Sequence, residues 1–122
     1  MPGYFSYIAI PCTDYSRAFN FYSGITNGKL VKNPGVPFPM AYFKDEYGNN
    51  IGHLFQMQGI EPSADGPIVY LRLSENLNDT LSKVEGLGGK VIMPKSLISA
   101  EAGYWAIFLD SEGNRLALHS MK

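Results

Sequence analysis

Residues 45–49 read Asp-Glu-Tyr-Gly-Asn and residues 110–114 read Asp-Ser-Glu-Gly-Asn, so one turn motif, Asp-x-x-Gly-Asn, occurs twice at an offset of 65 residues. In such a turn the Gly supplies a left-handed backbone position, and the Asp and Asn side chains cap the turn. A second pair of similar segments precedes the two turns, Asn27-Gly-Lys-Leu30 and Gly88-Gly-Lys-Val91, at an offset of 61. Two matches in the same order predict an internal duplication.

Each copy of the repeat is predicted to contain one strand, one helix and three further strands. Strands rich in aromatic and β-branched residues are expected at 5–12, 29–32, 40–44 and 50–57 in the first copy, and at 68–73, 90–93, 103–109 and 115–120 in the second. Helices are expected over 15–24, where Asp14 is a good N-cap, and over 76–87, where leucines and a valine recur at helical spacing. Residues 94–102 are predicted to be a loop, long enough for a lid or a dimer contact.

Composition narrows the class of protein. The 122 residues are 45% hydrophobic and carry a net charge of -1, which disfavours both disorder and a basic nucleic-acid binder. No apolar run approaches the roughly 20 residues of a membrane helix, and the first residues do not resemble a secretory signal. Cys12 is the sole cysteine and is expected to be a small apolar filler near a strand end. We therefore expect one cytoplasmic domain with neither a nucleic-acid nor a membrane partner.

Three segments carry a more specific resemblance. They are Ile10-Pro-x-Thr-Asp14-x-x-Arg17-Ala18-x-x-Phe21-Tyr22, Leu87-Gly-Gly-Lys-Val91 and Asp110-x-x-Gly-Asn114. Together they resemble the vicinal oxygen chelate superfamily, which includes glyoxalase I, extradiol dioxygenases and bleomycin-resistance proteins. The likeness spans essentially the whole chain and is strongest to glyoxalase-related single-domain proteins.

The resemblance implies an α+β fold. Two βαβββ modules, at about residues 4–58 and 66–120, would form a curved eight-stranded mixed sheet with helices on its convex side. The ligand site would lie in the concave cleft, and the protein would be a homodimer.

Enzymes of the superfamily hold a divalent metal (Zn, Ni, Mn or Fe) with His, Glu or Gln side chains from four central strands. By resemblance these positions fall on Tyr7, Gly52, Ile68 and Ala117. Gly, Ile and Ala offer no donor atom, and a protonated Tyr is a poor ligand for these ions. His53 is expected to turn toward the helices, on the face opposite His119. The sequence therefore predicts no metal cofactor and leaves open whether the protein is an enzyme.

Strand alternation and the family analogy predict the residues that line the cleft. The predicted ligand-binding set is Tyr7, Tyr42, Tyr70, Arg72, Trp105 and His119, with Arg115 on the same face. Aromatic walls with a few polar tips are typical of small-molecule sites, and an Arg in such a site suits a carboxylate or phosphate. We therefore predict a small-molecule ligand that is planar or aromatic and carries an acidic group.

Other readings of the same residues stay open. The aromatic side chains could be plain packing, and Arg72 could pair with an acid across a dimer interface. Three functions compete: a metal-free binding protein similar in principle to the bleomycin-resistance proteins, a glyoxalase-like lyase, isomerase or dioxygenase with a divergent active site, and an interaction module without a ligand. For the enzyme, His119 is the sole histidine expected in the cleft and hence the candidate base.

Overall fold

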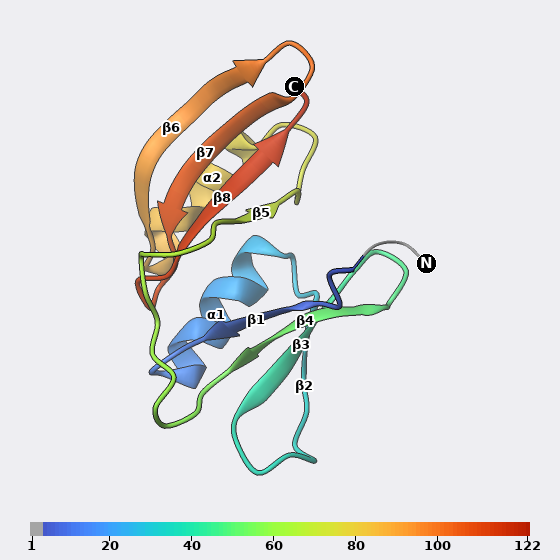
Figure 1. Cartoon of the computed structure of the whole chain (residues 1–122), viewed down its shortest axis with the longest axis vertical. Coiled ribbons are helices and arrows are strands. Elements are labelled where there is room, and N and C mark those ends of the chain that lie inside the picture. The colour runs from blue at the N-terminus through green and yellow to red at the C-terminus, as the bar shows by residue number, and fades with distance from the viewer. Residues whose placement is uncertain (1–3) are drawn as a thin grey trace.

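The computed structural model describes residues 4–122 and contains the predicted repeat (Figure 1). The first module comprises β1 (Ile8–Pro11), α1 (Tyr15–Ile25), β2 (Leu30–Lys32), β3 (Met40–Lys44) and β4 (Asn50–Phe55). The second comprises β5 (Val69–Leu71), α2 (Asn78–Val84), the 3-10 helix η1 (Glu85–Leu87), β6 (Lys90–Ser99), β7 (Gly103–Leu109) and β8 (Arg115–Ser120). The prediction of an α+β fold with two βαβββ modules is confirmed.

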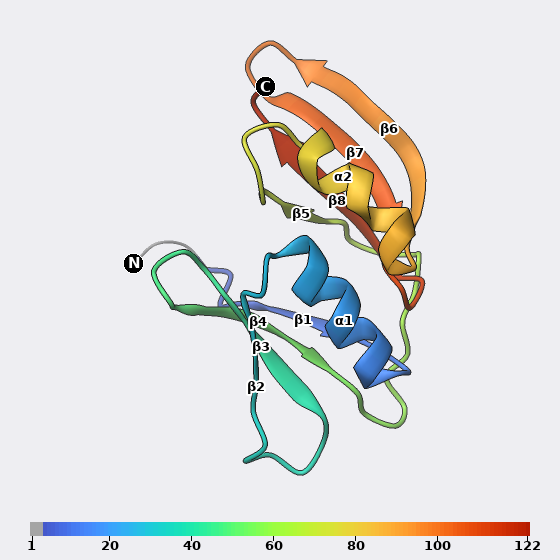
Figure 2. The same ribbon diagram turned by 180° about the vertical axis from the view of Figure 1, so that it is seen from behind.

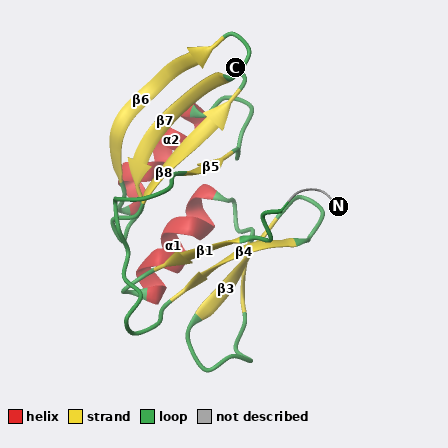
Figure 3. Ribbon diagram, viewed as in Figure 1, coloured by secondary structure: helices red, strands yellow, loops and turns green. Residues whose placement is uncertain are grey.

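The eight strands form two mixed sheets of four, in the orders β1-β4-β3-β2 and β5-β8-β7-β6. In each sheet the first strand runs parallel to the last strand of its module, and the other pairs are antiparallel. Both helices lie on the same side of the two sheets, in front of them in Figure 2, so that the opposite faces are free of helices (Figures 2 and 3). No ladder joins β1 to β5 within residues 4–122, and the two sheets meet at a seam.

The duplicated turns have the same geometry. Asp45 and Asp110 each accept hydrogen bonds on Oδ1 from the backbone N–H groups two and four residues further on, at 2.8–2.9 Å. Asn49 and Asn114 each donate their side-chain amide to the second carboxylate oxygen, at 3.2 and 2.9 Å. The Gly of each turn has a positive φ, 83° and 91°. The repeat seen in the sequence is therefore also a repeat in structure.

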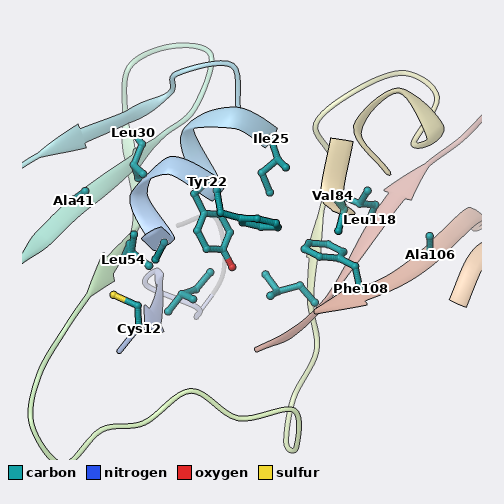
Figure 4. Close-up of a cluster of buried hydrophobic side chains, with 14 of the residues drawn as sticks. Cys12, Tyr22, Ile25, Leu30, Ala41, Leu54, Val84, Ala106, Phe108 and Leu118 are labelled. Carbon is teal, nitrogen blue, oxygen red and sulfur yellow. The ribbon is translucent and has the colours of Figure 1, made fainter. Parts of the chain in front are cut away.

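One apolar core serves both modules, and buried residues of α1 belong to the same cluster as residues of both sheets (Figure 4). Phe21, Tyr22 and Ile25 of α1 are buried against Leu54 of β4 and Phe108 of β7. Cys12 is buried within this core. As predicted, Asp14 caps α1 by accepting a hydrogen bond from Arg17 N at 3.1 Å. None of the helices in residues 4–122 is both long and apolar enough to span a bilayer.

The prediction of a loop over 94–102 is wrong for most of that segment. The long β6 strand continues to Ser99 along the outer edge of the second sheet (Figure 1). Its pairing with β7 shifts register three times, and Pro94 lies in the middle of the strand. An edge strand tolerates both features because only one of its sides must form a regular ladder. Turn-forming residues in the sequence thus indicated an irregular strand rather than a loop.

Polar contacts close one end of the seam between the modules. The Glu112 side chain, from the second turn, is fully buried and accepts hydrogen bonds from Thr13 N (3.0 Å), Asp14 N (2.8 Å) and Arg17 Nε (2.7 Å). Burial opposes ionisation of this carboxyl, but the hydrogen bonds outweigh it and lower the pKa of Glu112 to about 2. The buried Tyr22 hydroxyl adds a further contact by donating to the carboxylate of the same turn.

The other end of the seam is apolar and partly open. A cavity of about 100 Å³ lies there between β1 and β5. Its walls include Ile8, Ile10, Phe43, Val69 and Leu71. The two sheets are therefore joined firmly at the end that holds the second turn and are separated at the opposite end.

Candidate functional site

The helix-free face of the second sheet gathers four of the six residues predicted to bind a ligand. Tyr70 of β5, Trp105 of β7 and His119 of β8 lie on this face, and Arg72 follows just after β5. The Tyr70 and Trp105 rings are stacked, with centroids 5.7 Å apart and planes 11° apart. The His119 ring lies 6.3 Å from the Tyr70 ring. We call these four residues the aromatic face.

His119 is hydrogen bonded through both ring nitrogens. Nε2 lies 2.6 Å from the backbone oxygen of Ala102, in the β6–β7 connection, and Nδ1 lies 3.0 Å from Nη2 of Arg72. A carbonyl oxygen only accepts and a guanidinium only donates, so Nε2 carries the proton and Nδ1 accepts from Arg72. In this arrangement neither nitrogen of His119 has a free lone pair with which to take a proton from a substrate.

The guanidinium of Arg72 has spare hydrogen-bonding capacity. The side chain is exposed, and no carboxylate in residues 4–122 lies within ion-pair distance of it. Its contact with His119 uses one of five N–H donors. Arg115, the other arginine predicted on this face, instead donates to the backbone oxygen of Gly66 at 2.8 Å. Of these two arginines, Arg72 is the one placed beside the aromatic rings with donors available.

The remaining predicted residues lie on the helix-free face of the first sheet. The Tyr7 hydroxyl is 3.1 Å from Nδ1 of His53, and Tyr42 is the cross-strand neighbour of His53 on β3. Desolvation by burial lowers the pKa of His53, which favours its neutral form. Tyr7 and Tyr42 thus form a second group with His53, which was not among the predicted ligand-binding residues.

The predicted orientations of Gly52 and His53 are wrong. Gly52 pairs with Ile8 and Phe43 on the helix side, where a Cβ atom would lie only 2.3 Å from the Ile8 oxygen. The reason is a bulge: the register of β3 and β4 shifts between Phe43 and Lys44, which inserts one extra residue after the first turn. A shift of one residue exchanges the two faces of a strand. His53 therefore lies on the helix-free face, as His119 does, but on the other sheet.

The sequence profile of the Glyoxalase/Bleomycin resistance protein/Dioxygenase superfamily matches residues 4–118. The chain belongs to this superfamily. The resemblance drawn from the sequence motifs is thereby confirmed. No curated protein matches the chain.

Several solved structures share the fold of this chain. A hypothetical protein from S. aureus superposes with a TM-score of 0.74 at 18% identity, covering 98% of this chain and 95% of that one. The fosfomycin resistance protein FosX from Listeria monocytogenes, as an E126Q mutant complexed with Mn(II) and 1S,2S-dihydroxypropylphosphonic acid, gives 0.71 at 12% identity, covering 100% and 94%. TnmS3, an antibiotic binding protein from Streptomyces sp. CB03234, gives 0.66 at 21% identity, covering 98% of each chain.

The residues at the superfamily's metal positions do not fit a four-ligand site. Corrected for the bulge, these positions are Tyr7, His53, Ile68 and Ala117. Ile68 and Ala117 have no donor atom, and Tyr7 and His53 are hydrogen bonded to each other. Over residues 4–122 no three His, Cys, Asp or Glu side chains are grouped so as to hold a metal ion. A divalent ion would find at most two side-chain donors here, fewer than the three or four of typical catalytic sites.

Proposed function

We propose that the protein binds a small planar organic anion on the aromatic face, without a divalent metal. The observation that carries the proposal is the stacked Tyr70–Trp105 pair with the unpaired guanidinium of Arg72 held beside it. Such a ligand would place a ring on the aromatic side chains and a carboxylate or phosphonate group against Arg72. This geometry combines an apolar surface with one oriented polar group, as small-molecule sites do.

The chemistry of the face supports both parts of this ligand. A further ring stacked on an aromatic pair gains about 0.5–1.5 kcal/mol beyond the area it buries. A carboxylate matches the planar fork of a guanidinium and can take two parallel hydrogen bonds from it. Because the face is open, we expect affinity in the range of about 1 mM for a single-ring probe.

The structural neighbours support the ligand class. TnmS3 is described as an antibiotic binding protein, and the FosX mutant is complexed with an organic phosphonic acid. The antibiotic and the phosphonic acid are both small molecules, and the phosphonic acid carries an acidic group. The acidic group of the molecule bound to FosX agrees with the chemistry proposed for Arg72.

The single tryptophan makes the proposal directly testable, since all tryptophan fluorescence comes from Trp105 on the proposed face. The probes are 4-nitrobenzoate and 4-nitrobenzamide, which share a planar quenching ring and differ in charge. We expect the carboxylate to quench Trp105 at lower concentration than the amide. Arg72→Gln should reduce the preference for the carboxylate about tenfold, because it replaces the charged guanidinium with a neutral amide. Lys90→Gln, which changes an exposed cation on the β6 edge of the same sheet, is the control. Equal quenching by both probes in the wild type would rule out the anion contact.

The metal-free character is tested separately. Protein dialysed against Mn(II) is assayed by electron paramagnetic resonance, in which the signal of free Mn(II) falls as the ion binds. We expect no stoichiometric loss of signal, because Tyr7 and His53 provide only two donors. Stoichiometric Mn(II) binding that is abolished by His53→Ala would refute this part of the proposal and would favour a metal-dependent enzyme.

A divergent enzyme remains the second candidate, and one observation favours it. The Tyr7–His53 pair joins a phenolic hydroxyl to an imidazole whose lowered pKa favours the neutral form, an arrangement suited to general acid–base chemistry of a lyase or isomerase. Loss of a detected isomerase or lyase activity in both Tyr7→Phe and His53→Gln would favour the enzyme over the binding protein.

Homodimer formation and a cytoplasmic location stay predictions from the sequence. Sedimentation equilibrium tests the dimer.

A further inference from the structure

A chain of two hydrogen bonds connects Arg72 to the backbone of the β6–β7 connection. The Ala102 oxygen accepts from Nε2 of His119 at 2.6 Å, and Nδ1 of His119 accepts from Nη2 of Arg72 at 3.0 Å. His119 itself is held by β8, where it lies opposite Trp105 in the ladder. The imidazole therefore has a fixed tautomer and a fixed plane, and it offers one acceptor atom to the guanidinium.

We infer that His119 is a positioning residue that gives the site its preference for anions by orienting Arg72. The inference rests on the proposed function, because it concerns the same ligand site. It assigns His119 no proton transfer. The role differs from that of the catalytic base considered for His119 from the sequence, since both ring nitrogens are already occupied.

The physical reason lies in the freedom of an exposed arginine. Arg72 follows the short strand β5 and is exposed, so without a partner its long side chain would sample many rotamers. Ordering such a side chain on binding reduces affinity, whereas a side chain that is already held loses less entropy. His119 binds only one guanidinium hydrogen, so the remaining donors stay available for a carboxylate.

Packing alone is the competing role for His119, and it predicts different behaviour. The imidazole lies 6.3 Å from the Tyr70 ring, a contact that any flat ring of similar size preserves. Phe at position 119 would keep this contact and remove both hydrogen bonds. Gln at the same position would keep one acceptor and one donor in the side-chain amide. The two variants therefore separate orientation of Arg72 from packing.

The experiment measures the ratio of the dissociation constants of 4-nitrobenzamide and 4-nitrobenzoate by quenching of Trp105. We expect His119→Phe to lower this ratio by about three- to tenfold, through weaker carboxylate binding with little change for the amide. His119→Gln should restore most of the ratio. In the Arg72→Gln background His119→Phe should add nothing further, because the two residues act through one interaction.

Each outcome bears on a distinct statement. If the wild type shows no preference for the carboxylate, the proposed anion contact is wrong. If Arg72→Gln loses the preference and His119→Phe retains it, the binding proposal stands and the positioning role is refuted. Nitrogen NMR of wild-type His119 gives a test that needs no variant: the neutral Nε2–H tautomer is expected, and an Nδ1–H tautomer would overturn the inference.

Discussion

Glu112→Gln is the substitution that tests most directly how the two modules are held together. The carboxylate of Glu112 is fully buried. Its Oε1 atom accepts two backbone hydrogen bonds, from Thr13 N at 3.0 Å and from Asp14 N at 2.8 Å. Its other oxygen, Oε2, accepts from Arg17 Nε at 2.7 Å. Gln keeps the shape of the side chain but removes the negative charge. Its NH₂ group would also face N–H donors that now donate to a carboxylate oxygen, so at least one hydrogen bond is lost. The expected consequence is a loss of stability that depends on the ionised form.

The magnitude follows from the pKa of Glu112. Its fall from 4.5 to about 2 on folding corresponds to about 3 kcal/mol of the free energy of unfolding. Arg17 is half exposed, so solvent screens its share, and we expect about 2 kcal/mol at neutral pH. Because the folded pKa is depressed, this contribution is complete above pH 4.5 and disappears as the pH falls toward 2.

Urea denaturation of wild type and Glu112→Gln at neutral pH and through the acid range measures the effect. The difference in the free energy of unfolding should be largest at neutral pH and shrink progressively below pH 4.5. Glu46→Gln is the matched control, since Glu46 lies in the first copy of the turn and is exposed. A difference that stays constant with pH, or one no larger than that of the control, would refute the reasoning.

Three further predictions concern the core and the strand register. Gly52→Ala places a Cβ atom 2.3 Å from the Ile8 oxygen, and we expect a loss of about 1–3 kcal/mol in thermal or urea unfolding. Tyr22→Phe removes the 2.6 Å hydrogen bond to Asp110, and a loss of about 1–2 kcal/mol is expected from the same measurement. Burial, with smaller contributions from nearby carboxylates, raises the pKa of Cys12 to about 12, so iodoacetamide at neutral pH should label this thiol only after the protein is unfolded; rapid labelling of the native protein would contradict its burial.

The fold could be predicted because the signals that define it are local. The Asp and Asn residues of the duplicated turns form the same hydrogen bonds in both copies, so two copies of the motif indicate two copies of the unit. The residues that begin and end the helices are also recognised locally. Asp14 is the N-cap of α1, and Gly88 adopts a left-handed φ of 100° after η1. The failure over 94–102 has the opposite origin. Whether an irregular segment pairs depends on its neighbour β7, which local sequence does not specify.

The prediction of which residues share a face was correct on the second sheet and wrong in part on the first, for a single reason. Pairing between β7 and β8 is regular from Tyr104 to Leu109, so alternation places Trp105 and His119 on the same face. On the first sheet the bulge beside Lys44 changes the register once, and every later residue of β4 is assigned to the wrong face. No residue in the sequence identifies this bulge, because the same turn motif precedes both β4 and β8 although only β4 contains the extra residue. The hydrogen bond between the Tyr7 hydroxyl and Nδ1 of His53 follows from this shift, and counting residues from the turn could not reveal it.

The difference between the two turns also bears on which face would hold the proposed ligand best. The first turn is exposed, with Tyr47 82% accessible, whereas the second is buried against α1 through Glu112 and Asp110. A binding site needs side chains whose positions are fixed before the ligand arrives. Trp105 and His119 lie on the two strands that the buried turn connects, and therefore on the part of the second sheet tied to the core of both modules. On the first sheet, Tyr42 lies on β3, which is joined to β4 by a turn that the Asp45 side chain closes through hydrogen bonds within the turn itself. The duplication thus supplied two similar faces, and the contacts made by the second turn favour the aromatic face as the one that is preorganised.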